Sequence, residues 1–300
     1  MAQVETEPCW LLRCSRIIIE GLDVEANQEN ALRDWETFEE TLKKLRAEYG
    51  KKQSSPLLFR GQGNSEWPLA TTLERSGQTR MLFLDFYRLI CAGIGPRVET
   101  FTGVGVPAYD SKFCEKFLDP ELLLPFSGFP PEPLYRYMIY LRHHGFPSPL
   151  LDWSYSPYVA AFFAFRDDPL TKPEERSIYA YCESPQGVKG GAVGEPTIRP
   201  IGPYVRSHRR HFLQQSDYTI CGSWDASYGW RFDSHQHVFD NRRPKQDFLW
   251  KFNLPSSERI KVLRLLNDYN LNSFSLFDSE ESLLETMWLQ EQVLRKETRG

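Results

Sequence analysis

Aliphatic and phenylalanine side chains fill every position of residues 159–165, which read VAAFFAF. Ser156 and Pro157 stand just before this run, and these residue types are favoured at the N-cap and the first position of a helix. A helix that is apolar on nearly every face is buried. The pattern therefore predicts a buried helix whose N-terminal N–H groups and positive dipole end face Asp152 and Ser154, where they could meet an anion.

Apolar positions three and four apart predict further helices. In residues 30–49 this spacing puts Trp35, Phe38, Leu42 and Leu45 on one buried stripe. Other helices are expected over residues 78–90, 115–124, 134–142 and 257–269. A last helix is expected to run to about residue 296 from a capping box at Asp278 and Glu281.

Short segments rich in β-branched and aromatic residues predict strands between these helices. They cover residues 16–22, 56–59, 177–182, 218–221 and 247–253. Loops or connectors are expected over residues 92–110, 222–230, 233–238 and 271–277. Short strands dispersed among helices indicate a single α+β domain, with short mixed or antiparallel strands and surrounding helices.

Composition narrows the class of protein. The net charge of −4 over 300 residues gives no overall field that favours nucleic acid or an anionic membrane, so any anion site must be local. Residues 1–10 lack the pattern of a secretory signal, and no apolar run is long enough to cross a membrane. Six scattered cysteines without a CxxC pair predict reduced thiols in a cytoplasmic protein.

Two polar clusters could perform chemistry or could be structural. Arg60 ends a predicted strand before Gly61-Gln62-Gly63, where it could reach a ligand or pair with a carboxylate such as Asp152. His143 and His144 follow a predicted helix, so one could be a general base or both could cap the last carbonyls.

A metal site is a further alternative, because five possible ligands lie close together in the sequence: His208, His211, Cys221, His235 and His237. Their spacing matches no closed four-ligand pattern, so no metal is expected.

Three motifs in order resemble the FRG domain family. The first is Phe59-Arg60-Gly61-Gln62, and the second is His144-Gly145-Phe146-Pro147 followed by Leu150-Leu151-Asp152-Trp153-Ser154. The third combines Arg210, Gln215, Tyr218 and Thr219. The chain has Pro149 where many members have Arg, and Ser216 where Gly is usual. The resemblance implies an FRG-type domain over residues 16–289 with an insertion at 92–133, flanked by segments 1–15 and 290–300.

The motif order is also similar to that of ADP-ribosyltransferases, which implies an ADP-ribosyltransferase-like core and NAD as substrate or ligand. Arg60 would grip the pyrophosphate, Ser154 would support the nicotinamide ribose, and Gln215 would occupy the catalytic position. Because Gln215 is neutral, Asp152 or Asp217 would supply the charge that stabilises a cationic sugar.

A non-catalytic binding module is the alternative function for the same cleft. Its expected ligand-binding residues share polar or aromatic side chains close to the motifs: Gln62, His144, Asp152, Trp153, Arg210 and Tyr218. Arg206 and Arg209 could add phosphate contacts, and Trp67 a stacking face. Both hypotheses predict a small anionic ligand and leave a protein partner or acceptor unidentified; nucleic acid and membrane partners are not expected.

Overall fold

The computed structural model describes residues 16–19, 22–49, 56–118, 129–167, 173–183, 189, 194–202, 209–240 and 247–295. The strands in these ranges are β1 (Arg16–Ile19), β2 (Leu22–Glu25), β3 (Gln28–Ala31), β4 (Leu58–Gln62), β5 (Leu151–Ser154), β6 (Glu175–Cys182), β7 (Thr197–Pro200), β8 (Ser216–Asp225), β9 (Gly229–Phe232) and β10 (Phe248–Pro255). β1 and β2 form an antiparallel pair of their own.

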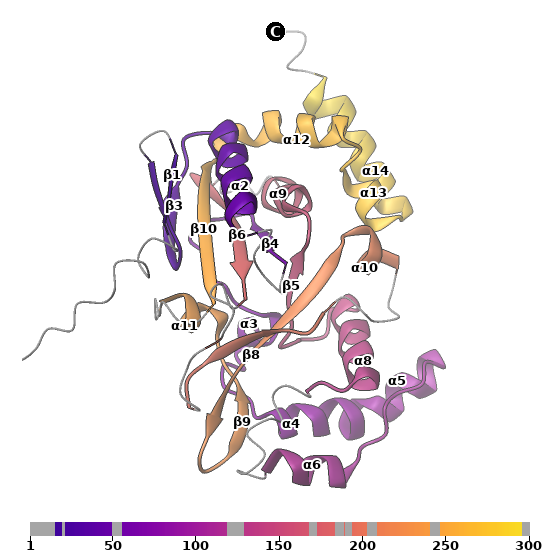
Figure 1. The fold of residues 1–300 in the computed structure, drawn as a ribbon. Coiled ribbons are helices and arrows are strands. Elements are labelled where there is room, and N and C mark those ends of the chain that lie inside the picture. Colours follow the sequence, from indigo (N-terminus) through magenta and orange to yellow (C-terminus); the bar gives the residue numbers. More distant parts are fainter. Residues whose placement is uncertain are drawn as a thin grey trace, which may run out of the picture.

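The other strands form one eight-stranded sheet, in the order β3-β10-β6-β4-β5-β8-β7 with β9 paired to β8 (Figure 1). β3 and β10 are parallel, and the remaining pairs are antiparallel. β4 and β5 share a single register pair, Phe59 with Ser154, whereas β6 and β10 pair along their whole length. The two strands therefore diverge near the middle of the sheet.

Helices lie around the upper part and around the lower part of this sheet in the view of Figure 1. The α-helices are α2 (Trp35–Tyr49), α3 (Thr72–Arg75), α4 (Phe83–Arg88), α5 (Gly95–Thr102), α6 (Ser111–Leu118), α8 (Glu132–His143), α9 (Pro157–Phe165), α10 (Arg209–Leu213), α11 (His235–Asp240), α12 (Arg259–Asp268), α13 (Ser273–Phe277) and α14 (Glu280–Trp288). Short π- or 3₁₀-helical turns are η1 (Leu89–Ile94), η2 (Ser256–Glu258) and η3 (Leu289–Leu294). The mixture of helices and a mixed sheet confirms the predicted α+β class.

Three apolar clusters hold the domain together. The first packs α2, α9 and α12 against β4, β6 and β10, and it contains the predicted stripe of Trp35, Phe38, Leu42 and Leu45. The second packs α4 and α8 against β8 and β9. The third lies under α11, around Trp153 and Tyr181. The sheet is thus packed against different helices on the two sides of the β4–β5 divergence.

The central helix forms as its sequence predicts. α9 begins at Pro157, and the Ser156 hydroxyl accepts a hydrogen bond from the backbone N–H of Val159. Most of its side chains are buried. The helix therefore lies in the core, beside β4, with its N-terminus directly after β5.

Several predicted boundaries are wrong. The helix expected from residue 30 starts at Trp35, because residues 28–31 pair with β10. The segments expected as loops or connectors contain α5, β9, α11, α13 and the end of β8. The last helix has Ser279 as its N-cap, with Ser282 completing the capping box, and not Asp278 with Glu281. These elements are short, and tertiary packing outweighs their weak local signals.

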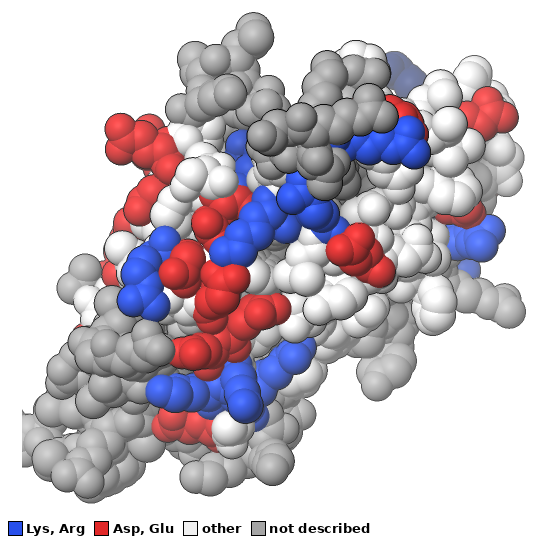
Figure 2. Space-filling model, turned by 90° about the horizontal axis from the view of Figure 1, so that it is seen from above, with Lys and Arg blue, Asp and Glu red and all other residues white. Residues whose placement is uncertain are grey.

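Charged side chains of both signs are interspersed on the face seen from above (Figure 2). Among the described cysteines, Cys91, Cys182 and Cys221 are buried free thiols. No helix in the described ranges is long and apolar enough to cross a membrane.

Candidate functional site

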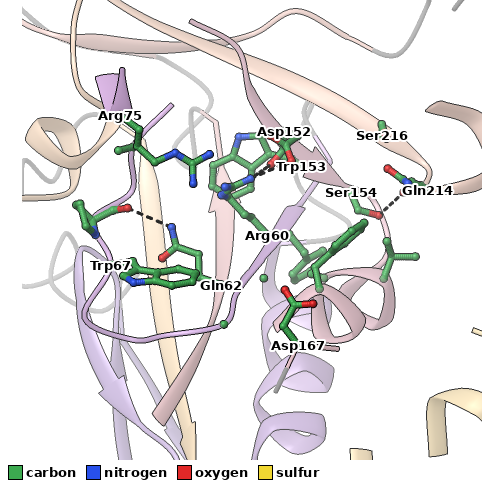
Figure 3. Close-up of a pocket in the computed structure, with 18 residues that line it drawn as sticks. Arg60, Gln62, Trp67, Arg75, Asp152, Trp153, Ser154, Asp167, Gln214 and Ser216 are labelled. Carbon is green, nitrogen blue, oxygen red and sulfur yellow. Dashed lines mark hydrogen bonds and ion pairs between the residues drawn. The ribbon is translucent and has the colours of Figure 1, made fainter. Parts of the chain in front are cut away.

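The divergence of β4 from β5 opens a cavity of about 610 Å³ beside α9 (Figure 3). The residues that line it come from β4 and the segment that follows it, the end of α3, β5, α9 and the residue after its end, and the start of β8: Phe59, Arg60, Gly61, Gln62, Gly63, Trp67, Pro68, Ala70, Arg75, Asp152, Trp153, Ser154, Val159, Ala160, Phe163, Asp167, Gln214 and Ser216. Predicted site residues Arg60, Gln62, Asp152, Trp153 and Ser154 are thus brought together.

Gly61 sets the width of this cavity, because its backbone lies against α9. A Cβ added at residue 61 would overlap the carbonyl oxygen of Ala160 and would lie 2.6 Å from the backbone nitrogen of Ala164. Only glycine permits so close an approach of strand and helix. Arg60 and Gln62, the neighbours of Gly61, therefore point away from the helix.

Two arginines share the carboxylate of Asp152. Arg60 Nη1 donates to the Asp152 carbonyl oxygen at 2.9 Å and lies 3.1 Å from Oδ2. Arg142, from α8, contacts Oδ1 through Nη2 and donates to Thr72 Oγ1 at 3.2 Å. Burial lowers the pKa of each guanidinium to about 10, and the charge of Arg60 contributes for Arg142. The predicted pairing of Arg60 with Asp152 is present, and Arg142 adds a second positive charge.

A third arginine, Arg75, reaches the same place from the end of α3. Its guanidinium points toward Arg60 and Asp152 (Figure 3). Burial, and then the charge of Arg60, lowers its pKa. Within the described ranges the Arg75 guanidinium makes no hydrogen bond or ion pair, and the buried Arg60 Nε has no hydrogen-bond partner. Three guanidiniums therefore lie close to the carboxylate of Asp152, and the charge of Glu74 opposes part of the lowering of the Arg75 pKa.

Gln62 and Trp67 form the other side of the cavity. Gln62 Nε2 donates to the Pro68 carbonyl oxygen at 3.2 Å, and that oxygen can only accept, so the orientation of the amide is defined. Gln62 Oε1 is buried and accepts no hydrogen bond from the described residues. Trp67 is 52% exposed and lies beside Gln62 (Figure 3). A half-exposed indole next to cationic groups is suited to stacking on an aromatic ring.

Ser154 lines the cavity, but its hydroxyl is engaged by the backbone. It donates to the Gln214 carbonyl oxygen at 2.8 Å and accepts from the Ser156 N–H at 3.0 Å. The Ser154 side chain thus fixes the turn from β5 into α9 and holds residue 214 at the cavity wall.

Gln215 lies in a turn with φ +48° and is exposed. Its neighbours Gln214 and Ser216 line the cavity, whereas Gln215 is absent from the described lining. Asp217 is buried, with Tyr155 Oη donating to its Oδ2 at 2.6 Å, and burial raises its pKa. Neither side chain is in the lining.

The remaining predicted ligand-binding residues are spread over other parts of the molecule. Arg210 donates from Nε to the Phe277 carbonyl oxygen at 3.3 Å, and Tyr218 is a buried core residue whose hydroxyl lies 3.3 Å from His143 Nε2. Burial raises the pKa of Tyr218 to about 12. The His144 ring lies against Tyr140 in a tilted arrangement, with ring centroids 4.4 Å apart, at a separate cavity of about 660 Å³.

Trp153 lies in the core at the edge of the cavity. Its Nε1 donates to Thr219 Oγ1 at 2.7 Å, and Thr219 Oγ1 lies 2.8 Å from Nε2 of the buried His235. Burial lowers the pKa of His235 to about 3. No cluster of three or more possible metal ligands occurs among the described residues, which omit His208.

Arg75 and Arg142 are site residues that the sequence analysis missed. Thr71 and Glu74 form a capping box that could have located α3 and hence Arg75. The apolar spacing predicts that Arg142 lies in a helix, but no local pattern shows that this helix brings Arg142 to Asp152. Arg142 approaches Asp152 from another element, α8.

One protein-family model matches the part of the chain that forms most of this cavity. Residues 55–172 match the FRG domain family model, so the chain contains an FRG domain. No curated protein and no solved structure matches the chain. The matched segment includes β4, α8, β5 and α9 and therefore contributes most of the cavity wall.

Proposed function

We propose that the Arg60 cavity binds an anionic nucleotide-like ligand, with NAD as the leading candidate. The observation that supports this most directly is the Arg75 guanidinium, which makes no ion pair with the described residues and lies beside Arg60 and Arg142, which share one carboxylate. Guanidiniums form strong charge-assisted hydrogen bonds with phosphate oxygens. A volume of about 610 Å³ falls within the range of small-molecule sites, and Trp67 offers a face for a base.

The test is the affinity of the purified protein for NAD and ADP-ribose by calorimetry. Arg75→Gln is expected to weaken binding by about 10-fold or more, because a charged hydrogen bond is lost. Arg80→Gln is the matched control, since Arg80 is exposed and outside the lining. Equal affinities of the two variants would exclude Arg75 from the binding site, and no affinity of the wild type for either ligand would exclude both as ligands.

ADP-ribosyltransferase-like cleavage of NAD is the second candidate. Asp167 supports it, because this 75%-exposed carboxylate lies in the cavity lining and pairs with Arg166, not with the arginines around Asp152. It could stabilise the cationic sugar that forms as nicotinamide leaves. Gln215, the residue at the predicted catalytic position, is exposed beside the cavity and not in its described lining.

Release of nicotinamide separates the two candidates. Cleavage predicts release by the wild type, a loss of about 10-fold or more in Arg60→Ala and Asp167→Asn, and a loss in Gln215→Ala if that residue takes part. Binding of NAD without release would identify a binding module.

A further inference from the structure

The apolar side chains of α14 face outward. Leu283, Leu284, Met287 and Trp288 are 39%, 65%, 51% and 67% exposed, whereas Ser282 and Thr286 on the opposite side are buried. This is the reverse of the usual arrangement, in which the apolar face of a surface helix packs on the core. An exposed group of large apolar residues on one helix face marks an interaction surface.

The buried hydroxyl of Thr286 ties the polar side of α14 to α13. Ser282 Oγ donates to the Ser279 carbonyl oxygen at 2.7 Å, and Thr286 Oγ1 donates to the Ser282 carbonyl oxygen at 2.8 Å. Thr286 Oγ1 also accepts from the Phe274 N–H at 2.9 Å, which joins α14 to α13. Turning the apolar face inward would break the bond between the Phe274 N–H and Thr286 Oγ1 and leave that N–H without its partner. An apolar face held outward in this way is available to another molecule.

Charge around the apolar face indicates the chemistry of that molecule. Glu285 pairs with Arg166 and Glu291 with Arg295, but Glu280 and Glu281 in the first turn make no ion pair in the described part of the chain. Residues 280–295 contain four Glu and one Arg, a net charge of −3. Two copies of this helix would repel each other, and an anionic membrane would be repelled as well.

We propose that the α14 face, defined by Leu283, Leu284, Met287 and Trp288, is a docking surface for a basic amphipathic helix of a partner protein. The apolar face of the partner covers the four side chains, and its flanking Lys or Arg residues meet Glu280 and Glu281. Binding of one helix through its apolar face is a common mode of peptide recognition, and Trp is frequent among the residues that dominate such interfaces.

The test uses the full chain and two synthetic peptides with the same helical period of Leu, one with Lys and one with Glu at the polar positions. Fluorescence anisotropy is expected to show binding of the Lys peptide and at least 10-fold weaker binding of the Glu peptide. The double variant Leu284→Gln/Trp288→Gln is expected to bind the Lys peptide with an affinity about 10-fold lower than that of the wild type. The double variant Glu280→Gln/Glu281→Gln is expected to lower the affinity for the Lys peptide by about 3-fold at low salt and by less at high salt.

Phe101→Gln is the control, because Phe101 is 91% exposed on α5 and remote in sequence from α14. Unchanged peptide affinity in Leu284→Gln/Trp288→Gln would overturn the proposal. Equal affinities for the Lys peptide and the Glu peptide would contradict the proposal that the partner helix is basic. The wild type could instead self-associate in sedimentation or bind anionic lipid vesicles. If Leu284→Gln/Trp288→Gln abolished that association or binding, the occupant of the α14 face would be a second copy of the chain or a membrane, and the proposal would be overturned.

Discussion

Gly61 is the position at which a single methyl group has the largest expected effect on the fold. Gly61→Ala would place a carbon against backbone atoms of Ala160 and Ala164, which cannot move without displacing α9. We expect a loss of about 3 kcal/mol or more in the free energy of unfolding, measured by urea denaturation. Gly105→Ala is the control, because a Cβ there meets no atom within 4 Å. Similar stabilities of the two variants would contradict the close strand–helix contact.

Local signals predicted part of the site at the residue scale. Arg60 and Gln62 stand out at a strand end before glycines, and Ser154 at a turn before an N-cap. Their placement in one cleft came from the resemblance to known families, which also put His144, Arg210 and Gln215 there, outside the described lining. Arg75 and Arg142 come from other elements, and their approach depends on how α3 and α8 pack. For the same reason, sequence order did not reveal that Gln215 turns away from the cavity.

At the scale of the elements, a chain of hydrogen bonds joins β5, β8 and α11 through Trp153, Thr219 and His235. Burial lowers the folded-state pKa of His235 to about 3, against about 6.5 in the unfolded chain. The unfolded state therefore gains a proton first as the pH falls. Stability from neutral His235 is complete above about pH 6.5 and declines toward about pH 3, by up to about 1 kcal/mol per pH unit.

His235→Gln is expected to make this decline shallower, because the variant has no imidazole to titrate at position 235. Urea denaturation at about pH 7 and about pH 5 measures the difference. His144→Gln, which alters an exposed histidine, is expected to retain the wild-type dependence. An equally steep decline in His235→Gln would show that other groups dominate.

The sequence predicts elements with regularly spaced apolar residues, or dense in aromatic and β-branched residues, better than it predicts short elements. α2, α8, α9 and α12 have apolar positions at helical spacing, and β6 and β10 are dense in aromatic and β-branched residues. α5 begins at Gly95-Pro96, and α11 and α13 are only about one turn long, so they lack such signals. Their helical form depends on packing.

At the scale of the whole molecule, the proposed anion site joins residues that are far apart in the chain. Arg60 and Asp152 are separated by 92 positions, so the unfolded chain cannot present the site. An anion that binds only the folded state raises the midpoint of thermal unfolding. At 100 times its Kd, pyrophosphate is expected to raise Tm by about 4 °C.

Differential scanning fluorimetry measures this shift, with sodium chloride at matched ionic strength as the reference. Arg75→Gln is expected to lose most of it, and Arg80→Gln to retain it. A shift of the same size in Arg75→Gln would indicate that pyrophosphate binds elsewhere.

The single register pair between β4 and β5 has a consequence for solvent access to the backbone. β6 and β10 pair over eight residues, so their amide hydrogens are protected along the full ladder. β4 and β5 pair with β6 and β8 on their outer sides, but they share only the pair of Phe59 with Ser154 with each other. The amides that point from these two strands into the divergence are therefore available for faster exchange with deuterium. A ligand that bridges Arg60 and Arg75 would slow this exchange. Deuterium uptake at these strand ends would therefore report occupancy of the cavity directly, without any turnover and before the ligand is known.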